Sequence, residues 1–236
     1  MKLSTVLLEA PLPDDWDKSI YSENIPFSER IQYAKKRAKV VGIGSSRVAF
    51  EIPYEGRKTV LKIALTSAGV EQNREEAKVL SDDTVKQSKL FIPLIDFDKE
   101  NGDKPTWIHV EYGEGANLDK DSPKFQQYFG ISFRGLQTLL HFYYEHNELF
   151  PSLFPKRILK ICDEELASGA DLSAVCKKLA GYFKSLMDVC TKHRLELFEL
   201  ISPTNGHQIV WYKDHPVICD VGFTRDIWIK HYRSRM

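Results

Sequence analysis

Two glycines, Gly42 and Gly44, are followed by a run that is typical of a β-strand and not of a helix. The stretch VVGIGSSRVAFEIPYEGRKTVLKIA, residues 40–64, alternates apolar and polar residues, which predicts strands joined by a turn at YEGRK. Dinucleotide-binding folds and P-loops both place a helix directly after their glycines, so neither fits. A glycine loop between two strands remains, and its backbone amides, with Ser45 and Ser46, can lie over phosphate groups. The alternative is an ordinary hairpin that contains two glycines.

A lysine lies in the most apolar part of this region. Lys62 belongs to VLKIA, and on the inward face of such a strand it would need an anion or a carboxylate nearby. A solvated, outward-facing Lys62 is the alternative. Glu76 lies on a helix predicted over residues 68–81, with Glu75 as its competitor. A strand lysine paired with a helix glutamate can hold two phosphate oxygens in a fixed place.

An aspartate directly follows another apolar run near the end of the sequence. VICDVGF contains Asp220, followed by Val221 and Gly222. A carboxylate aimed into a cleft from the end of a strand can bridge Mg²⁺ to nucleotide phosphates. An aspartate that caps a turn before glycine is the alternative.

The order of the predicted elements indicates an α+β fold. Residues 1–38 read as an N-terminal leader with a short basic helix, and residues 39–115 as a strand-rich part with one helix. Residues 116–236 read as a larger helical part that ends in a short strand pair and a tail. We expect a ligand cleft between the two parts.

The quoted motifs together are similar to a known superfamily. Gly-x-Gly on a hairpin, VLKIA, the glutamate in REEAKVL and the run WIHVEYGEGANL resemble the small lobe of the protein-kinase-like superfamily. GSSRVAFEI, VLKIA and QN are most similar to kinase-like proteins encoded by tailed bacteriophages, over residues 39–226. The resemblance implies a bilobal fold with a small antiparallel-sheet N-lobe and a shortened helical C-lobe, and it implies ATP and Mg²⁺ as cofactors.

The resemblance also implies roles for single residues of the small lobe. Val110 would stand at the back wall of an adenine pocket, and Glu111 and Tyr112 would offer the backbone groups of a hinge. The third glycine of the usual loop is absent, and Ser46 or Arg47 occupies its region.

In the region of the predicted catalytic base and metal ligands, the sequence departs from the family pattern. Glu199 would stand where the catalytic aspartate belongs, and its longer side chain would displace the base by about 1 Å, which can cost about 100-fold in rate. Either Asn205 or Gln208 would join Asp220 at the metal. His193, which is followed by Arg194 and Leu195, is expected to end a long helix.

Two functions from different classes therefore remain open. One is an atypical ATP-dependent phosphotransferase, in which Lys62, Glu199 and Asp220 carry the chemistry. The other is a pseudokinase that acts as an interaction protein toward host or virion components. Sixteen residues follow Asp220, so we expect no long activation segment. We expect the tail to form a short helix packed under the helical half; a partner-docking tail is the alternative.

Composition limits the partners and the compartment. Lysine plus arginine and aspartate plus glutamate both number 33, so net charge gives no argument for nucleic acid or an anionic membrane as a partner. A protein substrate or a binding partner remains open. No 20-residue apolar stretch exists, and the four cysteines lack metal-ligand spacing. We expect buried, reduced thiols and a cytoplasmic protein, in the host cytoplasm or associated with the virion if phage-encoded.

Overall fold

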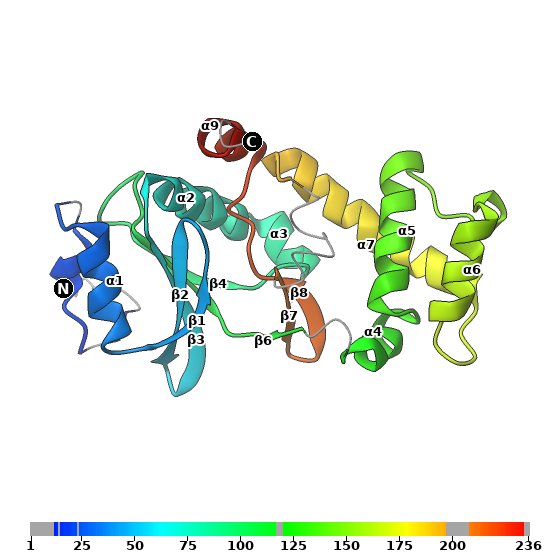
Figure 1. The fold of residues 1–236 in the computed structure, drawn as a ribbon, viewed down its shortest axis with the longest axis horizontal. Coiled ribbons are helices and arrows are strands. Elements are labelled where there is room, and N and C mark those ends of the chain that lie inside the picture. The colour runs from blue at the N-terminus through cyan, green and yellow to red at the C-terminus, as the bar shows by residue number, and fades with distance from the viewer. Residues whose placement is uncertain (1–11, 14, 23, 117–119, 197–207, 234–236) are drawn as a thin grey trace, which may run out of the picture. The chain divides into compact units, whose positions relative to one another are not determined.

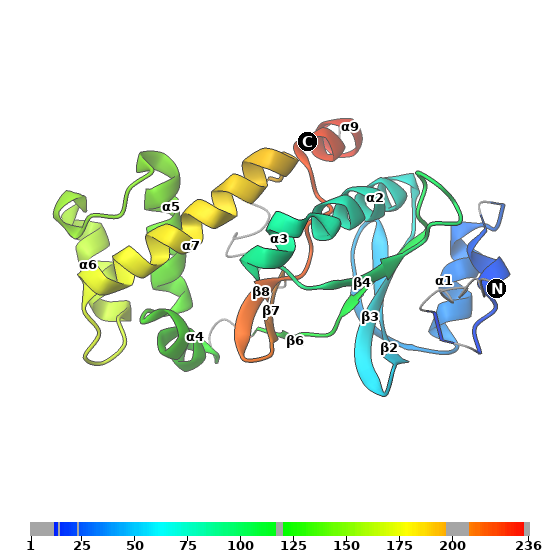
Figure 2. The same ribbon diagram turned by 180° about the vertical axis from the view of Figure 1, so that it is seen from behind.

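The computed structural model describes residues 12–233, apart from 14, 23, 117–119 and 197–207. Within these residues the chain is an α+β protein with eight α-helices, a five-stranded antiparallel sheet near the N-terminus and a three-stranded antiparallel sheet. The chain divides into two units. The first unit comprises residues 1–112 together with 220–236, and the second comprises residues 113–219. Figures 1 and 2 show the elements of each unit from two sides.

The first unit is built on the five-stranded sheet, in which the strand order is β1-β2-β3-β5-β4. Along the chain its elements are the 3-10 helix η1 (Lys18–Tyr21), α1 (Phe27–Lys35), β1 (Lys39–Ile43), β2 (Arg47–Tyr54), β3 (Arg57–Ala64), α2 (Ser67–Ser81), α3 (Asp83–Ser88), β4 (Leu94–Phe97), β5 (Trp107–Glu111) and α9 (Arg225–His231). The strands predicted around the YEGRK turn and the helix predicted over residues 68–81 are confirmed. The short helix α3 was not predicted.

The two faces of this sheet carry different side chains. Val48 and Phe50 of β2 and Leu61 of β3 face an apolar core that the N-terminal segment and α1 complete with Trp16 and Ile31. Helix α2 packs on the opposite face, against β3, β4 and β5. In Figures 1 and 2, α1 and α2 lie on opposite sides of the sheet. The N-terminal segment is therefore an integral layer of this unit, and the alternate positions of β2 and β3 point toward α2.

The second unit combines the three-stranded sheet with most of the helices. Its elements are β6 (Glu114–Gly115), α4 (Ser122–Phe129), α5 (Phe133–His146), the 3-10 helix η2 (Pro151–Leu153), α6 (Lys156–Glu165), α7 (Leu172–His193), β7 (Ile209–Tyr212) and β8 (His215–Ile218). The strand order is β6-β7-β8. Gly130, at φ 83°, ends α4, and the Ser132 side chain caps α5. Helix α7 ends at His193, as predicted, and Arg194 follows in the left-handed region.

The C-terminal helix packs differently from the expectation. We predicted that the tail would lie under the helical half, but its contacts are with α2 of the first unit. Lys230 and His231 of α9 both bind Glu71 of α2, the latter at 3.0 Å. A helix of seven residues is too short for its sequence to reveal which element it packs against.

The cysteines and the helices bear on the remaining predictions from composition. Cys162, Cys176 and Cys190 are buried free thiols, as predicted, and Cys219 is partly exposed. Burial raises the pKa of the Cys162 thiol to about 11. In the part of the chain that the structure describes, no helix is long and apolar enough to cross a membrane.

Candidate functional site

The β2–β3 hairpin determines which side chains share the face beneath α2. Glu55 and Gly56 have φ of 49° and 72°, as in a two-residue type I′ turn. This turn pairs Ala49 with Lys62 and Arg47 with Ala64. Directly opposed residues of an antiparallel pair lie on one face, and so do residues two positions apart. Arg47 and Lys62 therefore both face α2.

Helix α2 supplies a carboxylate to this face. The Lys62 ammonium nitrogen lies 2.6 Å from Oε1 of Glu76, and the Glu76 side chain has no exposed area. Glu75, the competing candidate, is on a more exposed side of the helix and pairs with Arg74 and Lys78. Of the two glutamates, Glu76 is the one that binds Lys62.

Arg47 connects Glu76 to Asp220. Its Nη1 donates to Oε2 of Glu76 at 2.6 Å and to the amide oxygen of Asn73 at 3.2 Å. Its Nη2 donates to Oδ1 of Asp220 at 2.5 Å. Burial alone would lower the pKa of Arg47, but the two carboxylates outweigh it and raise that pKa. Four charged side chains, Arg47, Lys62, Glu76 and Asp220, thus form one network, which we call the charge cluster.

Asp220 reaches the charge cluster through a close approach of its own segment to α2. Partial burial of Asp220 raises its pKa, but the charges of Arg47 and Lys62 and a hydrogen bond from the Gly222 amide outweigh this effect and lower the pKa to about 2. A Cβ at Gly222 would lie 2.5 Å from the carbonyl oxygen of Gln72. Gly222 is therefore glycine because a side chain there would collide with the backbone of α2, and not because its φ is unusual. The Asp220 side chain remains 39% exposed.

The glycine loop between β1 and β2 is fastened to α2 and α9. The Gly44 amide donates to the Arg47 carbonyl at 2.9 Å. The Ser46 hydroxyl is buried and donates to Gln72 at 2.7 Å, and the Ser45 hydroxyl lies 3.4 Å from that of Tyr232. A Cβ at Gly42 or Gly44 would make only ordinary contacts. The loop is thus held by its serines, and its expected role over phosphates remains a prediction.

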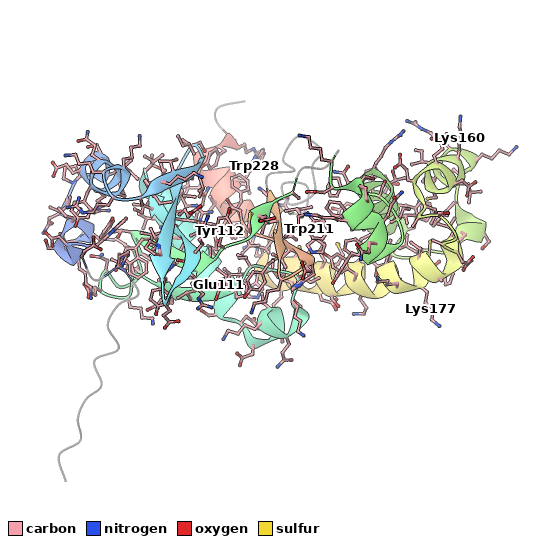
Figure 3. The ribbon with its side chains drawn as sticks, turned by 90° about the horizontal axis from the view of Figure 1, so that it is seen from below. Glu111, Tyr112, Lys160, Lys177, Trp211 and Trp228 are labelled. Carbon is pink, nitrogen blue, oxygen red and sulfur yellow. The ribbon has the colours of Figure 1, made fainter. Side chains whose placement is uncertain are left out.

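The residues predicted for the adenine hinge lie at the end of β5. Val110 is buried and pairs with Val60 of β3. The Glu111 amide donates to the Pro93 carbonyl at 3.0 Å, and its carboxylate binds Arg57 at 2.9 Å. Glu111 and Tyr112 are labelled in Figure 3. Because the Glu111 amide already has an acceptor, any free hinge donor must come from another position.

Of the other residues predicted to act as catalytic base or metal ligand, the structure describes only Gln208. Glu199 and Asn205 lie outside the described residues. Gln208 belongs to the second unit, where its carbonyl accepts from the Cys219 amide at 2.8 Å. Within the described residues its buried side-chain oxygen has no hydrogen-bond partner. The structure therefore joins Lys62, Glu76 and Asp220, and it leaves the predicted catalytic base and second metal ligand untested.

Among the described residues, the carboxylates of the charge cluster are already paired with cations. Mg²⁺ usually keeps several waters and is held by one or two carboxylates together with substrate phosphates. In the described ranges no group of three or more His, Cys, Asp or Glu residues could hold a metal. The Asp220 carboxylate already binds a guanidinium, and Glu76 binds two cations.

Arg47 is the functional candidate that the sequence analysis missed. It was considered only as a replacement for a loop glycine. The register set by the two-residue turn at Glu55–Gly56 places it on the same face as Lys62, and that register could have been counted from the sequence. No protein-family model matches the chain, and no curated protein is significantly similar to it.

Proposed function

We propose that this protein is a kinase-like nucleotide-binding protein with a bilobal fold, resembling the kinase-like proteins of tailed bacteriophages. One observation carries the proposal. A lysine of β3, a glutamate of α2 and an aspartate that follows β8 meet in one cluster. Lys62 and Glu76 are buried and lie 2.6 Å apart, and Asp220 is partly exposed. Kinases use a strand lysine, a helix glutamate and an aspartate before glycine to position nucleotide phosphates.

In this proposal the ligand is ATP. Lys62 would bind its phosphates, and Glu76 would keep the ammonium group oriented. The loop from Gly42 to Ser46 would cover the phosphates, and the Val110–Tyr112 segment would contact the adenine. Phosphoryl transfer would also need a divalent cation and a base. Glu199 is the proposed base, which would accept the proton of a substrate hydroxyl.

A second candidate, a pseudokinase that acts as an interaction protein, is favoured by one specific observation. The Asp220 carboxylate, which should bind the metal in a kinase, binds Arg47 at 2.5 Å. A cation so placed competes with Mg²⁺ for the same carboxylate. Nucleotide binding is compatible with both candidates, whereas phosphoryl transfer is compatible only with the first.

Calorimetric titration with ATP tests the shared part of the proposal. Replacing Lys62 by Met should weaken ATP binding by about 10- to 100-fold, because a charge-assisted hydrogen bond contributes about 1.5–3 kcal/mol. Lys78→Met is the matched control, since Lys78 is an exposed lysine of α2, and it should bind ATP as the wild type does. Circular dichroism shows whether each variant is folded. Equal ATP affinity in Lys62→Met and the wild type would contradict the proposal, as would the absence of ATP binding in the wild type.

Transfer of labelled phosphate then separates the two candidates. The wild type is incubated with labelled ATP and a set of protein and small hydroxyl acceptors, beside Glu199→Ala and Asp220→Ala. Transfer that both substitutions abolish favours the phosphotransferase. ATP binding without any transfer favours the pseudokinase.

A further inference from the structure

Arg47 is held in place by both its backbone and its side chain. It is the first residue of β2, it pairs with Ala64 of β3, and its carbonyl accepts from the Gly44 amide. Its side chain is only 6% exposed. The two terminal nitrogens of its guanidinium group contact separate carboxylates, Glu76 through Nη1 and Asp220 through Nη2. A planar fork with fixed donors is well suited to bridge two acids, whereas a lysine is a single point charge.

The charges of the cluster already balance. Arg47 and Lys62 contribute two positive charges, and Glu76 and Asp220 contribute two negative charges. A divalent cation at Asp220 would give the cluster a net charge of plus two beside a buried guanidinium. Arginine does not lose its proton in proteins, so it cannot relieve this repulsion by becoming neutral. A metal that took Oδ1 of Asp220 would have to displace the Arg47 guanidinium from it.

We propose that Arg47 supplies the positive charge at Asp220 that a divalent cation supplies in protein kinases, so that nucleotide binding at this site is independent of metal ions. The second half of this statement rests on the proposed nucleotide-binding function. The first half, that Arg47 blocks metal binding at Asp220, can be measured without any nucleotide. The free phosphates would meet Lys62 and the Arg47 guanidinium in place of a metal complex.

Titration with Mn²⁺, followed by electron paramagnetic resonance, tests the metal half of the proposal. The wild type should bind no Mn²⁺ at Asp220. Arg47→Met should bind Mn²⁺ more tightly than the wild type, because the substitution frees a carboxylate and leaves the cluster with an excess negative charge, and adding Asp220→Asn should remove the gain again. Arg74→Met, which removes an exposed arginine of α2, should behave as the wild type. Mn²⁺ binding to the wild type that Asp220→Asn abolishes would overturn the proposal, and so would a folded Arg47→Met variant that binds Mn²⁺ no more tightly than the wild type.

Titration of the wild type with ATP, once in EDTA and once in excess Mg²⁺, tests the nucleotide half. The two dissociation constants should agree within about threefold. Tighter binding by about tenfold or more in Mg²⁺ would overturn the proposal, and this comparison decides it even if Arg47→Met does not fold. If ATP binds in neither buffer, the proposed function fails, and the Mn²⁺ experiment alone decides whether Arg47 blocks the metal.

Discussion

Removing the negative charge of Glu76 is the sharpest perturbation of the charge cluster. Glu76 has no exposed side-chain area and accepts from Lys62 and Arg47, each at 2.6 Å. Glu76→Gln preserves the size of the side chain and, closely, its helix propensity. The substitution therefore removes the charge with little change of shape. The glutamine amide group would also present a donor to one of the two cations.

The expected cost follows from burial. Removing one partner of a buried ion pair costs about 3–5 kcal/mol, because the other charge stays buried without compensation. Asp220 still compensates Arg47, so we expect a loss near the lower end, about 3 kcal/mol. With a urea dependence of about 2 kcal/mol per molar, the unfolding midpoint should fall by about 1.5 M.

Urea unfolding monitored by tryptophan fluorescence measures this loss, since Trp16 and Trp107 are buried in the first unit. Glu75→Gln is the matched control. Glu75 is the preceding residue of the same helix, is 21% exposed and binds only partly exposed cations, so it should cost less than about 1 kcal/mol. If both variants unfold within about 0.5 M urea of the wild type, the argument from burial is wrong.

Three further outcomes follow from the structure. Because folding lowers the pKa of Asp220 to about 2, the free energy of unfolding should fall as pH drops from about 4 to about 2, and Asp220→Asn should flatten this dependence in acid titrations of stability. Gly222→Ala should lower the melting temperature, because the added methyl group would meet the backbone of α2. Gly181 is a mid-helix residue of α7, and a Cβ there would meet no neighbouring atom, so Gly181→Ala should add about 0.5–1 kcal/mol of stability. Glu71→Gln should speed amide exchange in α9 by about two- to fivefold, equivalent to less than about 1 kcal/mol, as measured by hydrogen–deuterium exchange.

The strands of the hairpin could be predicted because the sequence signals that specify them lie close together along the chain. Alternating side chains define the strands, and the glycine in YEGRK identifies the turn that sets their register. The helix carrying Glu76 was predictable for the same reason. The short α3 was missed, because the capping of Thr84 by Asp82 is only a weak signal in the sequence.

The packing of distant segments was not predictable in this way. Helix α9 was expected from its sequence, but its position on α2 depends on Glu71, which carries no periodic signal that marks a contact. The bond between Arg47 and Asp220 joins residues 173 positions apart. Sequence spacing says nothing about such a pair unless a relative of known structure supplies the register.

The charge cluster explains why the far end of the chain belongs to the first unit. Without Asp220, β2, β3 and α2 would bury two cations against the single carboxylate of Glu76. An excess buried charge is costly, so this face of the sheet is electrostatically incomplete until residues 220–236 return to it. The Arg47–Asp220 bond therefore has two consequences. It neutralises part of the charge of the unit. Under the proposed function it would also occupy the carboxylate that a metal-dependent kinase keeps free, so that stability and metal binding would compete at Asp220.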